Sequence, residues 1–225
     1  DFACTLPNLK AFVQVSTDEV YGAAGEIPHI EWSPIIPSNP YAASKAAQEA
    51  IAISYWRTFG IPLLLVNTMN MFAELQHPEK FIPTAMRKIL NGESLPIYAA
   101  PDGTPGSRCW IHARNVADGI LFLIQNRLPG RYQHVAGTEP RPDRYHIAGD
   151  DLTNLEMAQK LAAALGRTLH YHLDDVHSAR PGHDLRYALD SSKMTSSGWK
   201  PPVSLEDGIA STASWTLAHK EWLEP

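Results

Sequence analysis

The sequence has few cysteines, no long apolar run and no grouping of metal ligands. Its two cysteines, Cys4 and Cys109, cannot form a disulfide framework, which favours a reducing compartment such as the cytoplasm. The apolar runs 61–66 and 120–124 fall far short of the ~18 residues that span a membrane, and the N-terminus lacks the features of a signal peptide. The 10 histidines are scattered without the spacing of zinc ligands. We therefore expect a cytoplasmic protein with neither a membrane segment nor a metal site.

An excess of positive charge is also missing. The formal net charge of −5 argues against nonspecific nucleic-acid binding, so an anionic ligand would have to be met by local arginines. The 225 residues are 44% hydrophobic and 19% charged, which is typical of a soluble globular chain with one large core, or one core and a small lobe.

Two glycine motifs are absent as well. The 14 glycines include no Gly-x-Gly-x-x-Gly, the turn that seats the pyrophosphate of a dinucleotide. No serine lies in a Gly-x-Ser-x-Gly turn, so a hydrolase of that kind is unsupported.

What is present is an apolar run, 12–15, that ends abruptly in Ser16, Thr17, Asp18 and Glu19. This pattern predicts a buried strand that delivers a hydroxyl and two acids to the edge of a sheet, where open α/β sheets bind their ligands. The run 61–67 predicts a second buried parallel strand, and the two form a crossover unit with the segment between them.

Residues 40–59 of that segment predict a helix. Pro40 suits a first turn, alanines fill the interior, and Gly60 ends the pattern. Ser38 is the expected N-cap. The residues before this helix, 23–37, are too irregular for an element and predict a solvated loop.

Tyr41 and Lys45 lie four residues apart on this helix and so share a face. An ammonium in that place is expected to lower the pKa of the phenol, ordinarily about 10, which would make Tyr41 a usable base. Tyr-x-x-x-Lys arises by chance in about one in four chains of this composition, so the spacing alone does not identify a site.

The segment Ser16 to Gly22, taken with Tyr41 and Lys45, resembles the extended short-chain dehydrogenase/reductase family. Within that family it resembles the nucleotide-sugar 4,6-dehydratases, of the dTDP-glucose type. Epimerases typically show two small hydroxyl residues at the position of the acid pair, and decarboxylases show a hydroxyl and one acid. The acid pair is therefore the discriminating feature.

The resemblance implies an α/β fold that combines the C-terminal part of a Rossmann-like, doubly wound parallel sheet with a smaller α/β lobe for a sugar nucleotide. We expect 1–78 to belong to the first part and 79–225 mainly to the lobe, with 108–126 returning to the Rossmann part. Family members carry their glycine turn far ahead of the equivalent of Thr17, so the resemblance covers only their C-terminal portion. The N-terminal, glycine-rich part of the family would then be supplied by another chain or be lost.

The resemblance also implies a reaction with bound NAD. Tyr41, supported by Lys45, removes the proton of the sugar 4-hydroxyl, and Thr17 hydrogen-bonds that oxygen. Glu19 then takes the C5 proton while Asp18 protonates the leaving 6-hydroxyl, which gives a 4-keto-6-deoxy sugar nucleotide for deoxysugar biosynthesis. The residues expected to contact NAD are Ser16, Tyr41, Lys45 and Asn67.

The implied substrate is a nucleotide-diphosphate sugar, either dTDP- or UDP-glucose. The residues expected to contact it are Thr17, Asn70, Lys80, Arg108, His146, Arg180 and His183. Lys80 is equally well explained as a surface residue, His146 as a structural one, and Arg180 as part of a surface salt-bridge cluster. Relatives usually have Asp where this chain has Cys109, which we interpret as a small buried apolar residue.

Three further expectations complete the prediction. The helix 41–59 is expected to pair two copies into a homodimer, as in the family. Residues 130–144 are interpreted as an insertion, with Arg141 and Arg144 as surface charge. A sister epimerase or decarboxylase, or a noncatalytic sugar-nucleotide-binding fragment, stays an alternative to the dehydratase.

Overall fold

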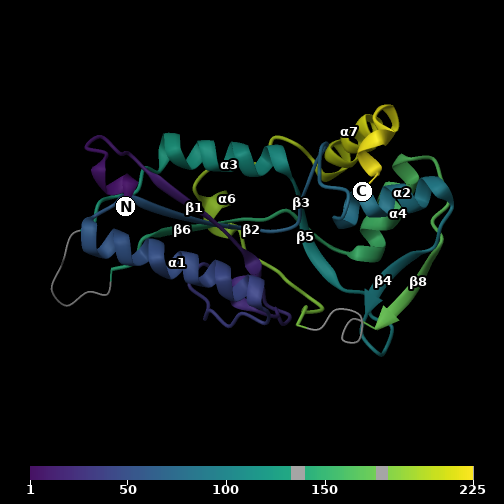
Figure 1. Cartoon of the computed structure of the whole chain (residues 1–225), viewed down its shortest axis with the longest axis horizontal. Coiled ribbons are helices and arrows are strands. Elements are labelled where there is room, and N and C mark those ends of the chain that lie inside the picture. Colours follow the sequence, from purple (N-terminus) through teal and green to yellow (C-terminus); the bar gives the residue numbers. More distant parts are fainter. Residues whose placement is uncertain (133–139, 176–181, 225) are drawn as a thin grey trace. The chain divides into compact units, whose positions relative to one another are not determined.

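The computed structural model describes residues 1–132, 140–175 and 182–224. The chain divides into two compact units (Figure 1). The first contains Asp1–Met69, Val116–Ala148 and Leu189–Lys200, and the second contains Asn70–Asn115, Gly149–Ala188 and Pro201–Pro225. Both units combine helices with parallel strand pairs, which confirms the predicted α/β class.

The first unit is built on a parallel three-stranded sheet in the order β1-β2-β6. The strands are β1 (Phe12–Thr17), β2 (Leu63–Thr68) and β6 (Asp143–Ile147). Thr17 is in register with Thr68, and Asn67 with His146, so the strands end at one common edge. This edge carries the predicted catalytic residues that follow β1.

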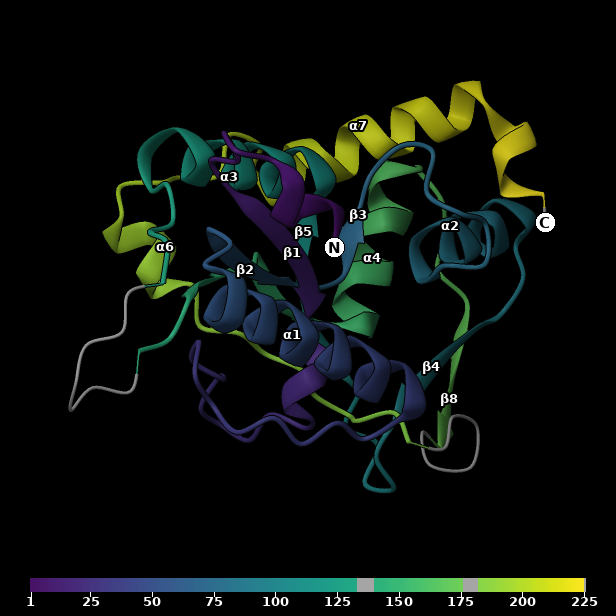
Figure 2. The same cartoon turned by 60° about the vertical axis from the view of Figure 1, so that its left-hand side comes forward.

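Helices cover both faces of this sheet. Helix α1 (Pro40–Phe59) lies on one face, and α3 (Ala113–Asn126) and α6 (Ser192–Ser196) lie on the other (Figures 1 and 2). Every residue of β2 is buried because both of its faces are covered, which explains its continuous apolar sequence. Trp56 of α1 packs on Leu63 and Leu65.

The limits of α1 follow from local chemistry. Its N-cap is Asn39, whose Oδ1 accepts a hydrogen bond from the Ala42 backbone N–H at 2.9 Å. The expected cap, Ser38, is wrong by one residue, because the amide side chain of Asn39 reaches the third helical N–H. Gly60 ends the helix with φ of +65°, as predicted.

The second unit has two small sheets. Strand β5 (Ser107–His112) pairs with β3 (Met71–Phe72) in parallel and with β7 (Asp150–Thr153) in antiparallel, and β4 (Leu95–Ala99) pairs with β8 (Tyr171–Asp175) in parallel. Two short 3-10 segments lie at the ends of the chain, η1 (Phe2–Thr5) in the first unit and η3 (Lys220–Leu223) in the second. The elements of the second unit are β3 (Met71–Phe72), α2 (Phe81–Asn91), β4 (Leu95–Ala99), β5 (Ser107–His112), β7 (Asp150–Thr153), α4 (Asn154–Ala164), β8 (Tyr171–Asp175) and α7 (Leu205–Ala218).

The core of the second unit lies between α2, α4 and α7 and includes Met86, Leu161 and Ile209. The predicted capping box at the start of α4 is present: Thr153 and Glu156 each bond the backbone N–H of the other. Cys109 is buried, in keeping with its interpretation as a small apolar residue. In the parts that the structure describes, no helix has both the length and the apolar character needed to cross a membrane.

Candidate active site

The carboxyl end of β1 runs directly into η2 (Asp18–Tyr21), a 3-10 helix that carries both predicted acids. Thr17 caps this helix: its Oγ1 accepts from the Glu19 backbone N–H at 3.4 Å and donates to Asp18 Oδ1 at 2.7 Å. Gly22 ends the turn with φ of +78°, and a Cβ atom there would collide with a backbone carbonyl of the loop that follows. Local backbone geometry therefore fixes where the hydroxyl and the acids lie.

The start of α1 is tied to the same turn by Asn39. While its Oδ1 caps the helix, its Nδ2 donates to Glu19 Oε2 at 3.0 Å. Sequence reasoning missed this residue, although it stands two positions before Tyr41. One amide side chain thus joins the helix that carries the phenol to one of the two acids.

Tyr41 lies beside Thr17, Asp18 and Glu19. Burial, followed by the negative charges of Glu19 and Asp18, raises the pKa of the Tyr41 phenol above its ordinary value, whereas a hydrogen bond with the Thr17 side chain lowers it. The side chain is still 55% exposed, so it is open to a ligand. The structure therefore brings together a phenol, a hydroxyl and two carboxyl groups.

Lys45 does not act on the phenol as the sequence suggested. Its Nζ donates to the Val15 carbonyl oxygen at 2.9 Å and so attaches α1 to β1. The expected lowering of the Tyr41 pKa is wrong, because burial, followed by the charges of Glu19 and Asp18, raises it.

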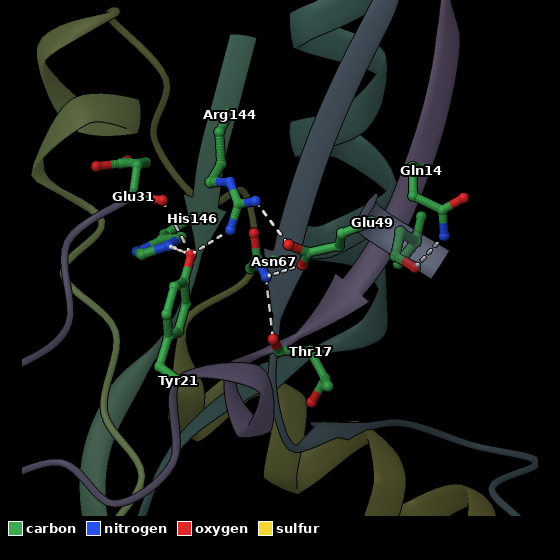
Figure 3. Close-up of polar contacts among 9 residues, drawn as sticks. Gln14, Thr17, Tyr21, Glu31, Glu49, Asn67, Arg144 and His146 are labelled. Carbon is green, nitrogen blue, oxygen red and sulfur yellow. Dashed lines mark hydrogen bonds and ion pairs between the residues drawn. The ribbon is translucent and has the colours of Figure 1, made fainter. Parts of the chain in front are cut away.

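A buried polar network lies one turn further along α1 (Figure 3). Glu49 is completely buried, and its carboxylate accepts from Arg144 NH2 at 2.6 Å and from Asn67 Nδ2 at 2.9 Å. The same Asn67 nitrogen donates to the Thr17 carbonyl oxygen at 3.0 Å. Asn67, a predicted cofactor contact, therefore links the buried acid Glu49 to the residue before η2.

The network continues from Arg144 to the other end of that turn. Arg144 NH1 donates to the Tyr21 hydroxyl at 2.8 Å, and this hydroxyl lies 2.8 Å from His146 Nε2. The His146 Nδ1 atom is 3.1 Å from the Asp190 carbonyl oxygen, which can only accept, so Nδ1 carries the proton. The one proton of the Tyr21 hydroxyl has two acceptors within reach, His146 Nε2 and the Glu31 carbonyl oxygen. Burial lowers the pKa of His146 to about 4 and raises that of Tyr21 to about 12.

One prediction about this region, surface charge at Arg144, is wrong, and the burial of His146 favours the structural role that the sequence left open. Arg144 is 1% exposed, so it is not surface charge, and its guanidinium lies 4.5 Å from the centre of the Trp32 ring. Arg141 stacks on the same ring at 5.0 Å. Trp32 thus attaches the loop 23–37 to the start of β6 rather than standing in solvent. His146, predicted to contact substrate, is completely buried within the network.

Three buried polar atoms at the ends of β1 and β2 have no hydrogen-bond partner within the described ranges. They are Ser16 Oγ, Asn67 Oδ1 and Thr68 Oγ1. Such atoms are rare in folded proteins and call for a partner, such as a polar ligand or water. Their place at the carboxyl ends of parallel strands is where open α/β sheets bind ligands.

The second unit contains a cavity of about 100 Å³. Three of its wall residues, Phe81, Tyr98 and Trp110, are aromatic, and most of the other lining residues are polar. Of the predicted substrate contacts, the cavity brings together Asn70, Arg108 and His183. Asn70 adopts a positive φ of 40°, a conformation that asparagine tolerates better than most residues.

Arg108 is held by main-chain oxygens. Its NH1 donates to the carbonyls of Ser107 at 2.6 Å and Leu185 at 2.8 Å, and its NH2 donates to that of Asp184 at 3.0 Å. The guanidinium also lies 4.5 Å from the centre of the Tyr187 ring. It therefore fixes the wall of the cavity, whatever else it binds.

Two other predicted substrate contacts have different outcomes. Lys80 is exposed, forms an ion pair with Glu79 at 3.2 Å and does not line the cavity. Arg180 lies outside the described residues. Among the residues that are described, no cluster of histidine, cysteine or acidic side chains is suited to hold a metal ion.

The chain is similar to dehydratases of nucleotide sugars. It is 33% identical to a dTDP-glucose 4,6-dehydratase of Streptomyces niveus over 99% of this chain. It is 34% identical to a dTDP-glucose 4,6-dehydratase of Xanthomonas campestris over 100% of this chain. A solved dTDP-glucose 4,6-dehydratase of Streptomyces venezuelae, with NAD and TYD bound, matches 96% of the chain at 35% identity with a TM-score of 0.79. The chain spans 62%, 64% and 62% of these three relatives.

These matches confirm the predicted resemblance to NAD-dependent epimerases and dehydratases of the extended short-chain dehydrogenase/reductase type. The model of the GDP-mannose 4,6 dehydratase family matches residues 3–212, which is most of the chain. The chain therefore belongs to the GDP-mannose 4,6 dehydratase family.

Proposed function

We propose that this chain carries the catalytic and sugar-nucleotide-binding parts of an NAD-dependent nucleotide-sugar 4,6-dehydratase. The observation that supports this most is the position of the Tyr41 phenol beside Thr17, Asp18 and Glu19. An elimination of water needs one group that accepts a proton and another that donates one. Two carboxyl groups on one turn, next to a phenol, can divide these roles.

The cofactor end of the site fits a nicotinamide. Ser16 and Asn67 are in register on adjacent strands, so their side chains share one face of the sheet. Ser16 Oγ can donate or accept and Asn67 Oδ1 accepts, which suits the donor and the acceptor of a carboxamide. Tyr41 and Lys45 would lie along the same ligand. Bound NAD+ would supply a hydride acceptor for C4 of the sugar and, once reduced, a hydride donor for C6. The sequence has no glycine turn for the pyrophosphate, so we expect the chain itself to bind NAD weakly.

The residues divide the proton transfers. Tyr41 takes the proton of the 4-hydroxyl, and Thr17 holds that oxygen. The 4-ketone acidifies the C5 hydrogen, which Glu19 removes and later returns as a proton to C5. Asp18 gives its proton to the 6-hydroxyl, which leaves as water. The nucleotide binds in the second unit, where the aromatic walls, Arg108 and His183 form the cavity, and dTDP-glucose or UDP-glucose is the proposed substrate.

The test is to incubate the protein with NAD+ and dTDP-glucose or UDP-glucose and to follow the alkaline absorbance of a 4-keto product. We expect Glu19→Gln and Asp18→Asn each to slow turnover on the order of 100-fold or more, whereas Glu26→Gln in the exposed loop has no effect. Because the pKa of Tyr41 is raised, the base form grows as the pH rises, and so turnover should increase above neutral pH.

Other outcomes would redirect the proposal. Turnover that survives both acid substitutions would contradict the elimination and favour a sister epimerase or decarboxylase. Calorimetric titration with NAD and, separately, with dTDP distinguishes an enzyme from a binding fragment: dTDP binding without any product would support the noncatalytic alternative. The proposed pairing of two copies through α1 is tested by size-exclusion chromatography, where a stable monomer would contradict it.

A further inference from the structure

Three residues at successive turns of α1 hold different parts of the first unit. Tyr41, Lys45 and Glu49 are spaced by four, so they lie on one face of the helix. The phenol meets the Thr17 side chain, the ammonium bonds the backbone of β1, and the buried carboxylate bonds Asn67 and Arg144. Tyr41 is therefore exposed at the start of the helix, and Glu49 is buried two turns away.

Glu49 is connected to the start of η2 through Asn67. A single nitrogen, Nδ2, donates to Glu49 Oε1 and to the Thr17 carbonyl oxygen. A carboxylate is the acceptor that best holds an amide in this orientation, because it has no hydrogen to oppose the donor. The main chain of Thr17 is thus connected to α1 by two consecutive hydrogen bonds.

Glu49 is connected to the end of η2 through Arg144. Its guanidinium bridges Glu49 and the hydroxyl of Tyr21, the last residue of η2. The Tyr21 hydroxyl also lies 3.1 Å from the Glu31 carbonyl oxygen (Figure 3). The Arg144 guanidinium lies 4.5 Å from the centre of the Trp32 ring. Both ends of η2, with Asp18 and Glu19 between them, are therefore attached to one buried ion pair.

We propose that Glu49 and Arg144 are positioning residues, which hold the Thr17–Glu19 segment at the Tyr41 phenol through Asn67 at one end of η2 and Tyr21 at the other. The importance of this alignment for catalysis rests on the proposed function. The alignment itself does not, and it can be measured without turnover. A displacement of about 1 Å at a reacting group lowers rates by on the order of 100-fold, so such anchors matter even far from the reacting atoms.

Glu49→Gln separates positioning from packing. The amide has nearly the shape of the carboxylate, but it offers one acceptor oxygen where two donors converge, from Arg144 and Asn67. Whichever way the amide is turned, an NH2 group faces one of these donors. The bond from Asn67 to the Thr17 carbonyl is expected to loosen, and the segment with both acids moves away from Tyr41.

The experiment measures the pKa of Tyr41 by following the 13Cζ resonance of labelled tyrosine against pH, with Tyr41→Phe to identify the signal. Near-ultraviolet circular dichroism shows over which pH range the fold persists. The Asp18 and Glu19 charges raise this pKa in the native protein, so their displacement in Glu49→Gln should lower it toward the ordinary tyrosine value. Tyr21→Phe, which removes only the hydroxyl at the other end of the turn, should shift it in the same direction.

The control is Leu161→Ala, which destabilises the core of the second unit and should leave the Tyr41 pKa unchanged. If Glu49→Gln and Tyr21→Phe lower stability but keep the native Tyr41 pKa, the pair is ordinary core structure and the inference is overturned. Where the native protein turns over substrate, Glu49→Gln should reduce kcat on the order of 100-fold with little change in KM. A native protein without turnover would contradict the proposed function alone, because the Tyr41 measurement still decides the positioning role.

Discussion

The two units hold their functional groups in different ways. In the first unit, the arginine of the network is 1% exposed, and its partners are the side chains of Glu49 and Tyr21. In the second, Arg108 is only partly buried and is held by main-chain carbonyl oxygens, those of Asp184 and Leu185 among them. The hydrogen bonds of one guanidinium therefore depend on other side chains, whereas the other guanidinium bonds main-chain oxygens and lies beside the Tyr187 ring.

This difference predicts how each unit responds to substitution. A buried charge that loses its partner cannot recover the loss by hydration. Substitutions in the network of the first unit should therefore lower the free energy of unfolding strongly and disturb every member of the network. A main-chain carbonyl near the surface can be met by water instead. Damage around Arg108 should therefore be smaller and should affect mainly the cavity.

The largest effect is expected for Arg144→Met. The substitution keeps an apolar chain of similar length but leaves Glu49 buried without its cation, and we expect a loss of about 3–5 kcal/mol in the free energy of unfolding. Urea denaturation measures it. Arg141→Met changes an exposed arginine that contacts the same Trp32 ring, and it should stay within about 0.5 kcal/mol. Equal losses for the two arginines would remove the contrast between buried and exposed guanidinium groups.

The next effect is a loss of stability in acid, caused by His146. Its pKa of about 4 in the folded protein lies below the ordinary value of about 6.5. Between these two values the unfolded chain binds a proton at His146 and the folded chain does not, which favours unfolding. Stability from this residue is intact above pH 6.5 and falls by about 3 kcal/mol as the pH drops to 4.

Denaturation curves at several pH values would sharpen this prediction. In His146→Asn the acid loss between pH 6.5 and pH 4 should be reduced, because asparagine does not titrate while it can still bond Tyr21 and the Asp190 carbonyl. His172→Asn, which changes an exposed histidine of the second unit outside this network, is the matched control. A profile that is unaffected by His146→Asn would mean that other groups govern stability in acid.

The smallest effect on stability is expected for Arg108→Met. The loss of its hydrogen bonds to three carbonyls should cost about 1–2 kcal/mol, and dTDP binding measured by calorimetry should weaken at least about tenfold because the cavity wall loosens. Lys160→Met, at an exposed ion pair with Glu206, should change stability by about 0–1 kcal/mol and leave binding intact. A loss as large as that of Arg144→Met would contradict the difference between the units.

Much of the fold could be predicted because its signals are local. The helix Pro40–Phe59 is announced by a proline in its first turn and a glycine just after its end, and the capping box at Thr153 is visible within four residues. The buried strand β2 follows from an unbroken apolar run. These features depend on neighbours in the sequence, so one sequence was enough.

The network could not be predicted because its partners are distant in the sequence. Arg144 lies 95 residues from Glu49 and 123 from Tyr21, and it follows a polar stretch rich in proline and arginine that is typical of a surface. Glu49 did carry a signal: it continues the spacing of four from Tyr41 and Lys45, and an acid on that face could have been examined. Where a fold buries a charge is decided by tertiary packing, which periodicity does not reveal.

The shared nitrogen of Asn67 has a consequence for how sequences of this family can diverge. Because Glu49 is met by donors from two different strands, a neutral residue at that position is tolerable only if both donors change with it. Three positions on three separate elements should then be inherited together as a set. Sequences that exchange one of them alone should be rare among relatives, and an alignment would make the linkage visible as correlated replacement.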